Sequence, residues 1–128
     1  MSNRGQGGLL FAWLPAVLYM GLIWALSSLR LTGVPIDLVP FRDKGAHFLE
    51  YAGLALLVAH AVLRTWPAHR WPRLYLAAVW IAAGWGLADE LHQAFVPGRS
   101  ADVRDLLADL AGASVGAGAR LLYERFRA

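Results

Sequence analysis

The chain has 128 residues, of which 58% are hydrophobic and 16% are charged, and its formal net charge is +3. A water-soluble domain of this length would need more polar surface, so the composition favours a single membrane domain over residues 1–128. The lack of cysteine excludes disulfides and thiolate sites, and arginines scattered around apolar runs provide no basic face for nucleic acid.

Four apolar stretches, at residues 9–29, 46–63, 74–95 and 103–123, predict the membrane-spanning elements. The first has no charged residue and would be about 31 Å long as a helix, enough for the roughly 30 Å hydrocarbon core of a bilayer. It is too long for a signal peptide, so we expect it to be retained. Helices of a soluble bundle carry a polar face that these stretches mostly lack. We therefore expect an all-α fold, an integral membrane bundle of four transmembrane helices.

Basic residues are divided unequally between the two ends of such a bundle. The end with both termini would hold seven of the twelve Lys and Arg residues, and the opposite end would hold five. Cytoplasmic loops are usually richer in Lys and Arg, so we expect both termini to be cytoplasmic. The loops after the first and third spans would then both face outward, and their polar residues would meet there.

Polar residues gather where the second span begins, in the segment DKGAHFLEYAGLALL. Asp43, His47 and Tyr51 recur every four residues and share one helical face, with Glu50 next to it. Asp43 suits the positive end of the helix dipole, and Tyr51 suits the membrane interface. Glu50 has no such explanation, because it lies about 10 Å of helical rise deeper than Asp43. We therefore treat His47 and Glu50 as functional candidates.

A second polar segment, DELHQAFVPGRSADVRDLLAD, begins at the end of the third span. Asp89, His92 and Gln93 share a helical face, whereas Glu90 points elsewhere. A proline ends the helix soon afterwards, and Arg99 follows in a tight turn. Its guanidinium can hold a carboxylate or a phosphate with two parallel hydrogen bonds.

The same segment continues into the fourth span with three aspartates. Asp102, Asp105 and Asp109 are spaced i, i+3 and i+7, so they lie along one helical face that runs into the membrane. Asp102 suits the start of a helix. A carboxylate in the middle of a bilayer costs at least about 2.5 kcal/mol, so we expect Asp105 and Asp109 to face partners inside the bundle. The small residues of LAGASVGAGA would let this span approach its neighbours closely.

Both polar segments resemble the signatures of the VanZ-like family of small bacterial membrane proteins. DKGAHFLEYAGLALL is similar to the first signature, D-K-x-x-H-F-x-x-Y-x-x-L. DELHQAFVPGRSADVRDLLADLAG is similar to the second, D-E-x-x-Q-x-F-x-P-G-R-x-x-x-x-x-D-x-x-x-N-x-x-G. The serine pair that closes the first span also fits. The sequence departs at Asp109, where the family usually has Asn, which leaves open whether this position needs a charge.

The resemblance implies a multi-pass protein of the bacterial inner membrane. The founding member of the family belongs to a glycopeptide-resistance gene cluster and raises tolerance to teicoplanin, an antibiotic with a lipid tail. The implied partners are membrane lipid and a lipid-linked cell-wall precursor or a lipoglycopeptide. No cofactor follows from the resemblance.

Three functions are compatible with these residues. The first is binding of a lipid-linked or lipoglycopeptide ligand, in which cations meet an anionic group and acids hold the cations in place. The candidate binding residues are Arg99, Lys44, Asp43, Tyr51, Glu90, Gln93, Asp105 and Asp109. We also expect one outward cavity to be lined by His47, Asp89, Arg99 and Asp105.

The second function is a membrane-embedded hydrolase or transferase. His47 would be its general acid or base, and Asp89 or Glu50 would orient the imidazole. No nucleophile is evident, and a divalent metal held by His47, Glu50, Asp89 and His92 could replace one. The third is structural, an ion-pair network that locks the spans together. A structural network would satisfy every charge, whereas a ligand site would leave polar groups unpaired.

Overall fold

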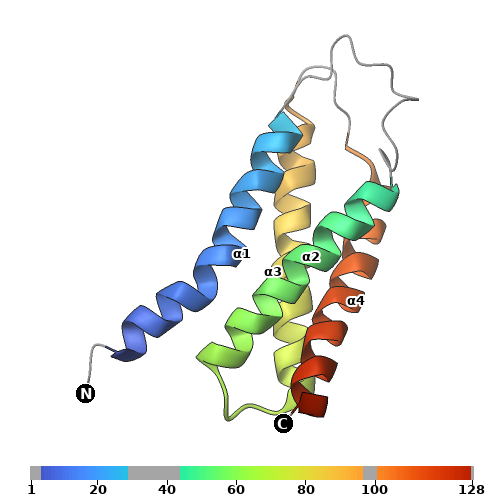
Figure 1. Cartoon of the computed structure of the whole chain (residues 1–128). Coiled ribbons are helices and arrows are strands. Elements are labelled where there is room, and N and C mark those ends of the chain that lie inside the picture. The colour runs from blue at the N-terminus through green and yellow to red at the C-terminus, as the bar shows by residue number, and fades with distance from the viewer. Residues whose placement is uncertain (1–3, 29–43, 97–100, 128) are drawn as a thin grey trace.

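The computed structural model describes residues 4–28, 44–96 and 101–127, and this part of the chain forms four helices and no strand. They are α1 (Arg4–Ser28), α2 (Lys44–Thr65), α3 (Trp71–Gln93) and α4 (Val103–Arg127), shown in Figure 1. The predicted all-α fold with four helices is confirmed.

Three of the helices are long and apolar enough to cross a membrane. The qualifying segments are Gly5–Ser28 in α1, Gly45–Thr65 in α2 and Trp71–Gln93 in α3. Helix α4 is as long as α1, at 25 residues, but Asp105, Asp109 and Arg120 interrupt its apolar sequence. The crossing of the membrane by α4 therefore stays a prediction.

Helix α1 presents large apolar side chains outward along its whole length. Phe11 is 76% exposed and Leu10 is 73% exposed, and Leu18 and Leu22 are exposed beyond them. Within the described residues α1 packs against α2 and α3 but makes no contact with α4. Apolar groups at such positions are unfavourable in water and are at home in lipid, which agrees with a membrane location.

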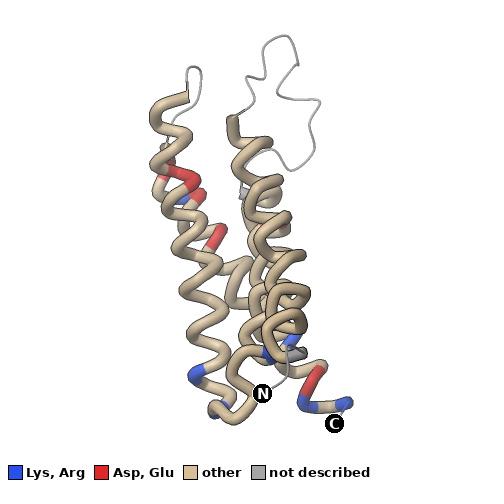
Figure 2. The backbone as a smooth tube through the Cα atoms, turned by 90° about the vertical axis from the view of Figure 1, so that its left-hand side faces the viewer, with Lys and Arg blue, Asp and Glu red and all other residues tan. Residues whose placement is uncertain are grey.

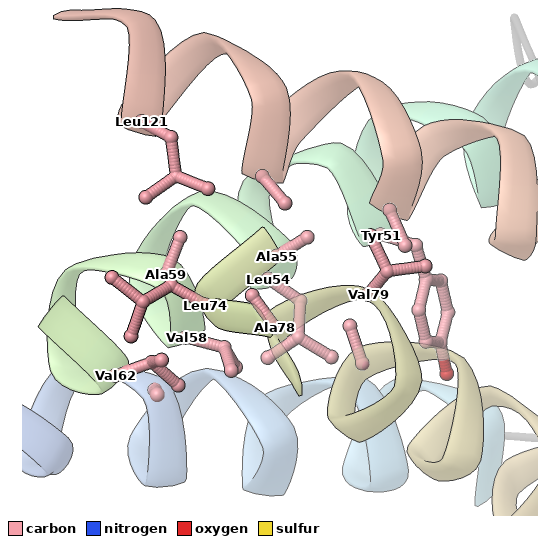
Figure 3. Packing of buried hydrophobic residues seen from close by; sticks show 14 of the residues in the cluster. Tyr51, Leu54, Ala55, Val58, Ala59, Val62, Leu74, Ala78, Val79 and Leu121 are labelled. Atoms are coloured by element: carbon pink, nitrogen blue, oxygen red, sulfur yellow. The ribbon is translucent and has the colours of Figure 1, made fainter. Parts of the chain in front are cut away.

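The core lies between α2 and the three helices around it (Figure 3). Tyr51, Leu54, Val58 and Val62 are fully buried and follow the helical repeat along one face of α2. The residues that meet them from α3 and α4 are mostly small, and include Ala78, Ala82, Ala113 and Ala117. Small residues permit close approach of the helix backbones, the usual way in which helices pack within a membrane.

The closest approach is between α2 and α4, and it depends on two glycines. A Cβ atom built at Gly112 would fall on the backbone carbonyl oxygen of Phe48, and one at Gly116 would fall on that of Ala52. The two glycines are four residues apart, so they lie on one face of α4, as in the small-xxx-small motif. This contact brings the first half of α4 directly against the start of α2.

The two ends of the bundle differ in charge. The end of α1, the start of α2, the end of α3 and the start of α4 lie at one end, and both chain termini lie at the other (Figure 1). Most acidic residues gather in the half away from the termini, and most described Lys and Arg residues lie near the termini (Figure 2). The expected meeting of both polar segments at one end of the bundle is confirmed for their described residues.

Candidate functional site

A histidine of α2 and two aspartates of α4 form the centre of the acidic end. The Nδ1 atom of His47 lies 2.8 Å from Oδ1 of Asp109, a hydrogen bond between helices that are remote in sequence. The Nε2 atom of His47 lies 3.6 Å from Oδ2 of Asp105. Both ring nitrogens of His47 therefore face carboxylates, Asp109 at Nδ1 and Asp105 at Nε2. The side chain of His47 is only 14% exposed.

Glu90 joins this centre from the last turn of α3. Its Oε2 atom accepts a hydrogen bond of 3.1 Å from the backbone N–H of Asp102, just before α4 begins. Asp102 in turn accepts a 2.8 Å hydrogen bond from the backbone N–H of Arg104, so it caps α4. One ligand atom each of His47, Glu90 and Asp109 lie within 4.8 Å of one another. We call these residues, together with Asp105, the polar centre.

Gly86 of α3 gives Asp109 its place in the bundle. A Cβ atom at Gly86 would lie 2.8 Å from Oδ2 of Asp109 and 3.2 Å from Cε1 of Tyr51. The carboxylate is thus packed against the backbone of α3, one helical turn before Glu90. Sequence reasoning did not identify Gly86 or Asp102 as part of the site, and the GWG run before Asp89 was the signal available for Gly86.

Several polar atoms of this region are buried without a partner among the described residues. They include Oδ2 of Asp109, Oε1 of Glu90 and the hydroxyl group of Tyr51. Asp109 is 1% exposed and Glu90 is 2% exposed, so water does not solvate them freely. An unsatisfied buried polar group costs about 1–3 kcal/mol, and more if it is charged. The polar centre therefore favours a proton, a cation or a hydrogen-bond donor at these oxygens.

A second polar cluster lies between α1 and α3. Ser27 donates a 2.7 Å hydrogen bond to Oδ2 of Asp89, and the amide of Gln93 donates to the same oxygen at 3.1 Å. The amide of Gln93 also lies 3.3 Å from the hydroxyl oxygen of Ser27. All three residues are buried, and Oδ1 of Asp89 has no partner in the described part of the chain. We call Ser27, Asp89 and Gln93 the serine–aspartate cluster.

Helices α1 and α3 make a further contact at the edge of this cluster. The hydroxyl group of Ser28 lies 2.8 Å from Nε2 of His92. The ring of His92 stacks on Trp24, with centroids 4.0 Å apart and planes 19° apart. Sequence reasoning did not place Trp24 or the two serines in a site. The signal for the serines was a pair of polar residues at the end of an otherwise uncharged apolar helix.

The structure divides the predicted site residues between these two groups. The expected pairing of His47 with Asp89 is not found, because Asp89 faces α1 and its neighbour Glu90 faces α4. For the same reason the expected metal set of His47, Glu50, Asp89 and His92 does not come together, since Asp89 and His92 contact α1 and His47 contacts α4. The prediction that Asp89 and Gln93 share one face of α3, whereas Glu90 points elsewhere, is confirmed.

The remaining predicted site residues lie outside the polar centre and the serine–aspartate cluster or outside the described residues. Tyr51 is fully buried in the core, and Glu50 is partly buried one residue before it on α2. Asp43, Arg99 and the side chain of Lys44 lie outside the described residues. Their predicted roles, and the cavity that Arg99 was expected to line, stay predictions.

The opposite end of the bundle holds a separate and more exposed set of charges. Arg120 and Glu124 of α4 form an ion pair of 2.9 Å, and Arg127 lies 3.2 Å from Glu124. The hydrogen bond from Arg120 lowers the pKa of the Glu124 carboxyl. The other guanidinium nitrogen of Arg120 lies 3.0 Å from Nδ1 of His60 on α2. These contacts of Arg120 and Glu124 join neighbouring turns of α4 and connect α4 to α2. They lie at the end of α4 that is remote from the polar centre.

Comparison with protein-family models identifies a family to which the chain is similar. The family model described as VanZ/LLP1 matches residues 9–124, which is nearly the whole chain. No curated protein and no solved structure shows significant similarity to it.

Proposed function

The chain belongs to the VanZ/LLP1 family of membrane proteins, and from this premise we propose that it binds the polar part of a lipid-linked or lipoglycopeptide-type molecule. The binding groups are those of the polar centre and the serine–aspartate cluster. The lipid part of the ligand lies in the bilayer beside the bundle. The protein resides in the inner membrane of a bacterium with both termini in the cytoplasm, so the polar centre lies at the outer end of the bundle.

The observation that carries this proposal is the set of buried carboxylate oxygens without partners. Asp89, Glu90 and Asp109 each have one such oxygen, as judged within the described residues. A network that served only to lock the helices together would satisfy these atoms, because each unsatisfied one weakens the fold. Their presence supports a ligand site over a purely structural role.

The chemistry of these oxygens indicates what the ligand offers. Carboxylate oxygens accept hydrogen bonds and attract positive charge, so the ligand presents hydroxyl, amide or ammonium groups. Lipid-linked sugars and peptides carry such groups next to a hydrocarbon chain, and so does a lipoglycopeptide. The exposed leucines and Phe11 of α1 provide an apolar surface suited to a lipid chain.

An enzyme acting on a molecule of this class is the second candidate, and the pairing of His47 with Asp109 favours it. A carboxylate that holds one ring nitrogen of a histidine fixes the orientation of the imidazole and stabilises its protonated form. His47 then acts as a general acid or base, oriented by Asp109 in place of Asp89. The hydroxyl of Ser27 already donates to Asp89, and we assign it no nucleophilic role.

Antibiotic tolerance provides the test. A susceptible host producing the chain is grown with teicoplanin, and with a glycopeptide that lacks the lipid tail as the matched compound. His47→Ala and Asp89→Asn should accumulate in the membrane at the wild-type level and lose tolerance to teicoplanin alone. Glu124→Gln, at the opposite end of the bundle, is the control and should keep tolerance. Full tolerance in both site variants would refute the proposal, and loss of both proteins from the membrane would support the structural alternative.

A further inference from the structure

We propose that His47, Glu90 and Asp109 bind a divalent transition-metal cation, Zn²⁺ in the first instance, between α2, α3 and α4. This site differs from the metal set that the sequence suggested, because it uses Glu90 and Asp109 in place of Glu50, Asp89 and His92. It uses two of the buried oxygens on which the ligand proposed above also relies, those of Glu90 and Asp109, but its test, metal content, differs from the tolerance test of that ligand.

The first argument is the convergence of three ligand atoms from three helices. Each of the three residues offers one nitrogen or oxygen atom, and these atoms all lie within 4.8 Å of one another. Metal–ligand bonds of about 2.0–2.2 Å place ligands of one Zn²⁺ roughly 3–4 Å apart, so only a small contraction is needed. Asp105, 3.6 Å from the other side of the imidazole, lies close enough to assist.

The second argument is independent of this proximity. Oδ2 of Asp109 and Oε1 of Glu90 are buried and accept no hydrogen bond from the described residues. Oδ2 of Asp109 points toward Gly86 of α3, and Glu90 is one turn further along the same face of that helix. Two almost fully buried carboxylates, with ligand atoms within 4.8 Å of each other, thus each keep an oxygen without a partner among the described residues. This arrangement is unfavourable unless a cation or protons are bound there.

The charge of the polar centre also requires compensation. Glu90, Asp105 and Asp109 bring three carboxylates, and within the described residues His47 forms ion pairs with Asp105 and Asp109, whereas Glu90 accepts only the backbone N–H of Asp102. Even a protonated imidazole would leave an excess of negative charge in a buried place. A divalent cation would neutralise this excess and satisfy the unused oxygens in one step.

Contacts that would orient the metal ligands are already present in the structure. A metal-binding histidine usually directs its other ring nitrogen to a carboxylate. If Nδ1 of His47 binds the metal beside Asp109, Nε2 faces the carboxylate of Asp105 at 3.6 Å. Glu90 is held by the backbone N–H of Asp102 through one oxygen, which leaves the other for a metal. The His47 ring and the Glu90 carboxylate are therefore both held in place by contacts within the described residues.

The donor types select among metals. One imidazole and two carboxylates suit Zn²⁺ with three protein ligands and one open position, and also suit Mn²⁺. Ca²⁺ prefers six to eight oxygen ligands and Mg²⁺ prefers an octahedron of oxygens with several waters, so both fit less well. We therefore expect the order Zn²⁺ above Mn²⁺, with Mg²⁺ and Ca²⁺ weakest.

Metal analysis of the purified full chain tests the proposal. The protein carries a tag without histidine, is purified in detergent without chelator, is loaded separately with Zn²⁺, Mn²⁺ and Mg²⁺, and is washed before elemental analysis. We expect about one Zn²⁺ per chain and a higher melting temperature with Zn²⁺ present, because a metal that binds only the folded state stabilises it. Glu90→Gln should weaken Zn²⁺ binding at least about tenfold and remove most of the thermal shift.

The neighbouring residue provides a matched control. Asp89→Asn removes an equally buried carboxylate of the same helix turn, but Asp89 faces Ser27 and Gln93, so this variant should bind Zn²⁺ like the wild type. Equal Zn²⁺ binding by both variants would show an adventitious ion and overturn the proposal. So would a wild-type chain that takes up no Zn²⁺ and melts at the same temperature with and without it, in which case protons occupy the centre.

Cobalt gives a readout on the wild-type chain that does not depend on the folding of any variant. Co²⁺ bound at the Zn²⁺ site in four-coordinate geometry absorbs visible light much more strongly than hydrated Co²⁺, and added Zn²⁺ should abolish the band. A spectrum identical to that of free Co²⁺ would overturn the proposal. If the wild-type chain binds metal but gives no teicoplanin tolerance, the proposed ligand is refuted and the metal site stands. If the chain gives tolerance but binds no metal, the metal site is refuted and the proposed ligand stands.

Discussion

Replacing Gly112 by alanine should separate α2 from α4 and open the polar centre. A Cβ atom at this position would fall on the carbonyl oxygen of Phe48, and it would lie 2.9 Å from the carbonyl carbon and 3.0 Å from Cα of the same residue. These atoms belong to the backbone of α2 and cannot move aside as a side chain would. The two helices must therefore shift apart along the contact that places Asp109 beside His47.

The size of the effect follows from competing contributions. Replacing Gly by Ala inside a helix normally stabilises it by about 1 kcal/mol. Overpacking a close contact costs about 1–3 kcal/mol, and weakening the hydrogen bond between His47 and Asp109 costs about 1.5–3 kcal/mol more, because one partner is charged. We therefore expect Gly112→Ala to lower the free energy of unfolding by about 1.5–5 kcal/mol.

The same helix offers a matched control. A Cβ atom at Gly118 would meet only Cε2 of Tyr75, at 3.7 Å, which is an ordinary van der Waals contact. Gly118→Ala should therefore be neutral or stabilising by up to about 1 kcal/mol. Unfolding of both variants in mixed micelles with increasing denaturing detergent, followed by circular dichroism, measures the difference. Equal stability of the two variants would refute the close contact of α2 with α4 and the position of Asp109 that depends on it.

Three further predictions concern orientation and the two polar groups. In intact cells an impermeant thiol reagent should label a cysteine introduced at Gly98 but not one introduced at Ala68. Labelling at Ala68 instead would show that the protein has the opposite orientation in the membrane. Ser27→Ala should cost about 1–3 kcal/mol in thermal unfolding, because a buried carboxylate loses a donor. Ser114→Ala, whose hydroxyl bonds only to its own helix, is the control and should change stability by less than about 0.5 kcal/mol. Arg99→Lys should abolish teicoplanin tolerance if a two-pronged guanidinium contact holds the ligand, and unchanged tolerance would exclude that role.

Helical periodicity was sufficient to predict how the polar residues of one helix are divided. On α3, Asp89 and Gln93 are four residues apart and share a partner, whereas Glu90 is turned away from them, as the sequence indicated. On α4, Asp105 and Asp109 were predicted to share a face directed into the bundle, and both contact His47. These predictions succeed because they depend only on local geometry.

The sequence by itself therefore determined the helices, their apolar character and the faces on which the acidic residues lie. Only the tertiary structure decided which face meets which neighbour. Asp89 turns to Ser27 of α1, and His47 takes Asp109 as its partner. The choice depends on how closely two backbones approach, which Gly86 and the paired glycines of α4 control through the absence of a side chain. Spacing along the chain carries no information about such a distance, because contacts between helices are set by the packing of all the helices together.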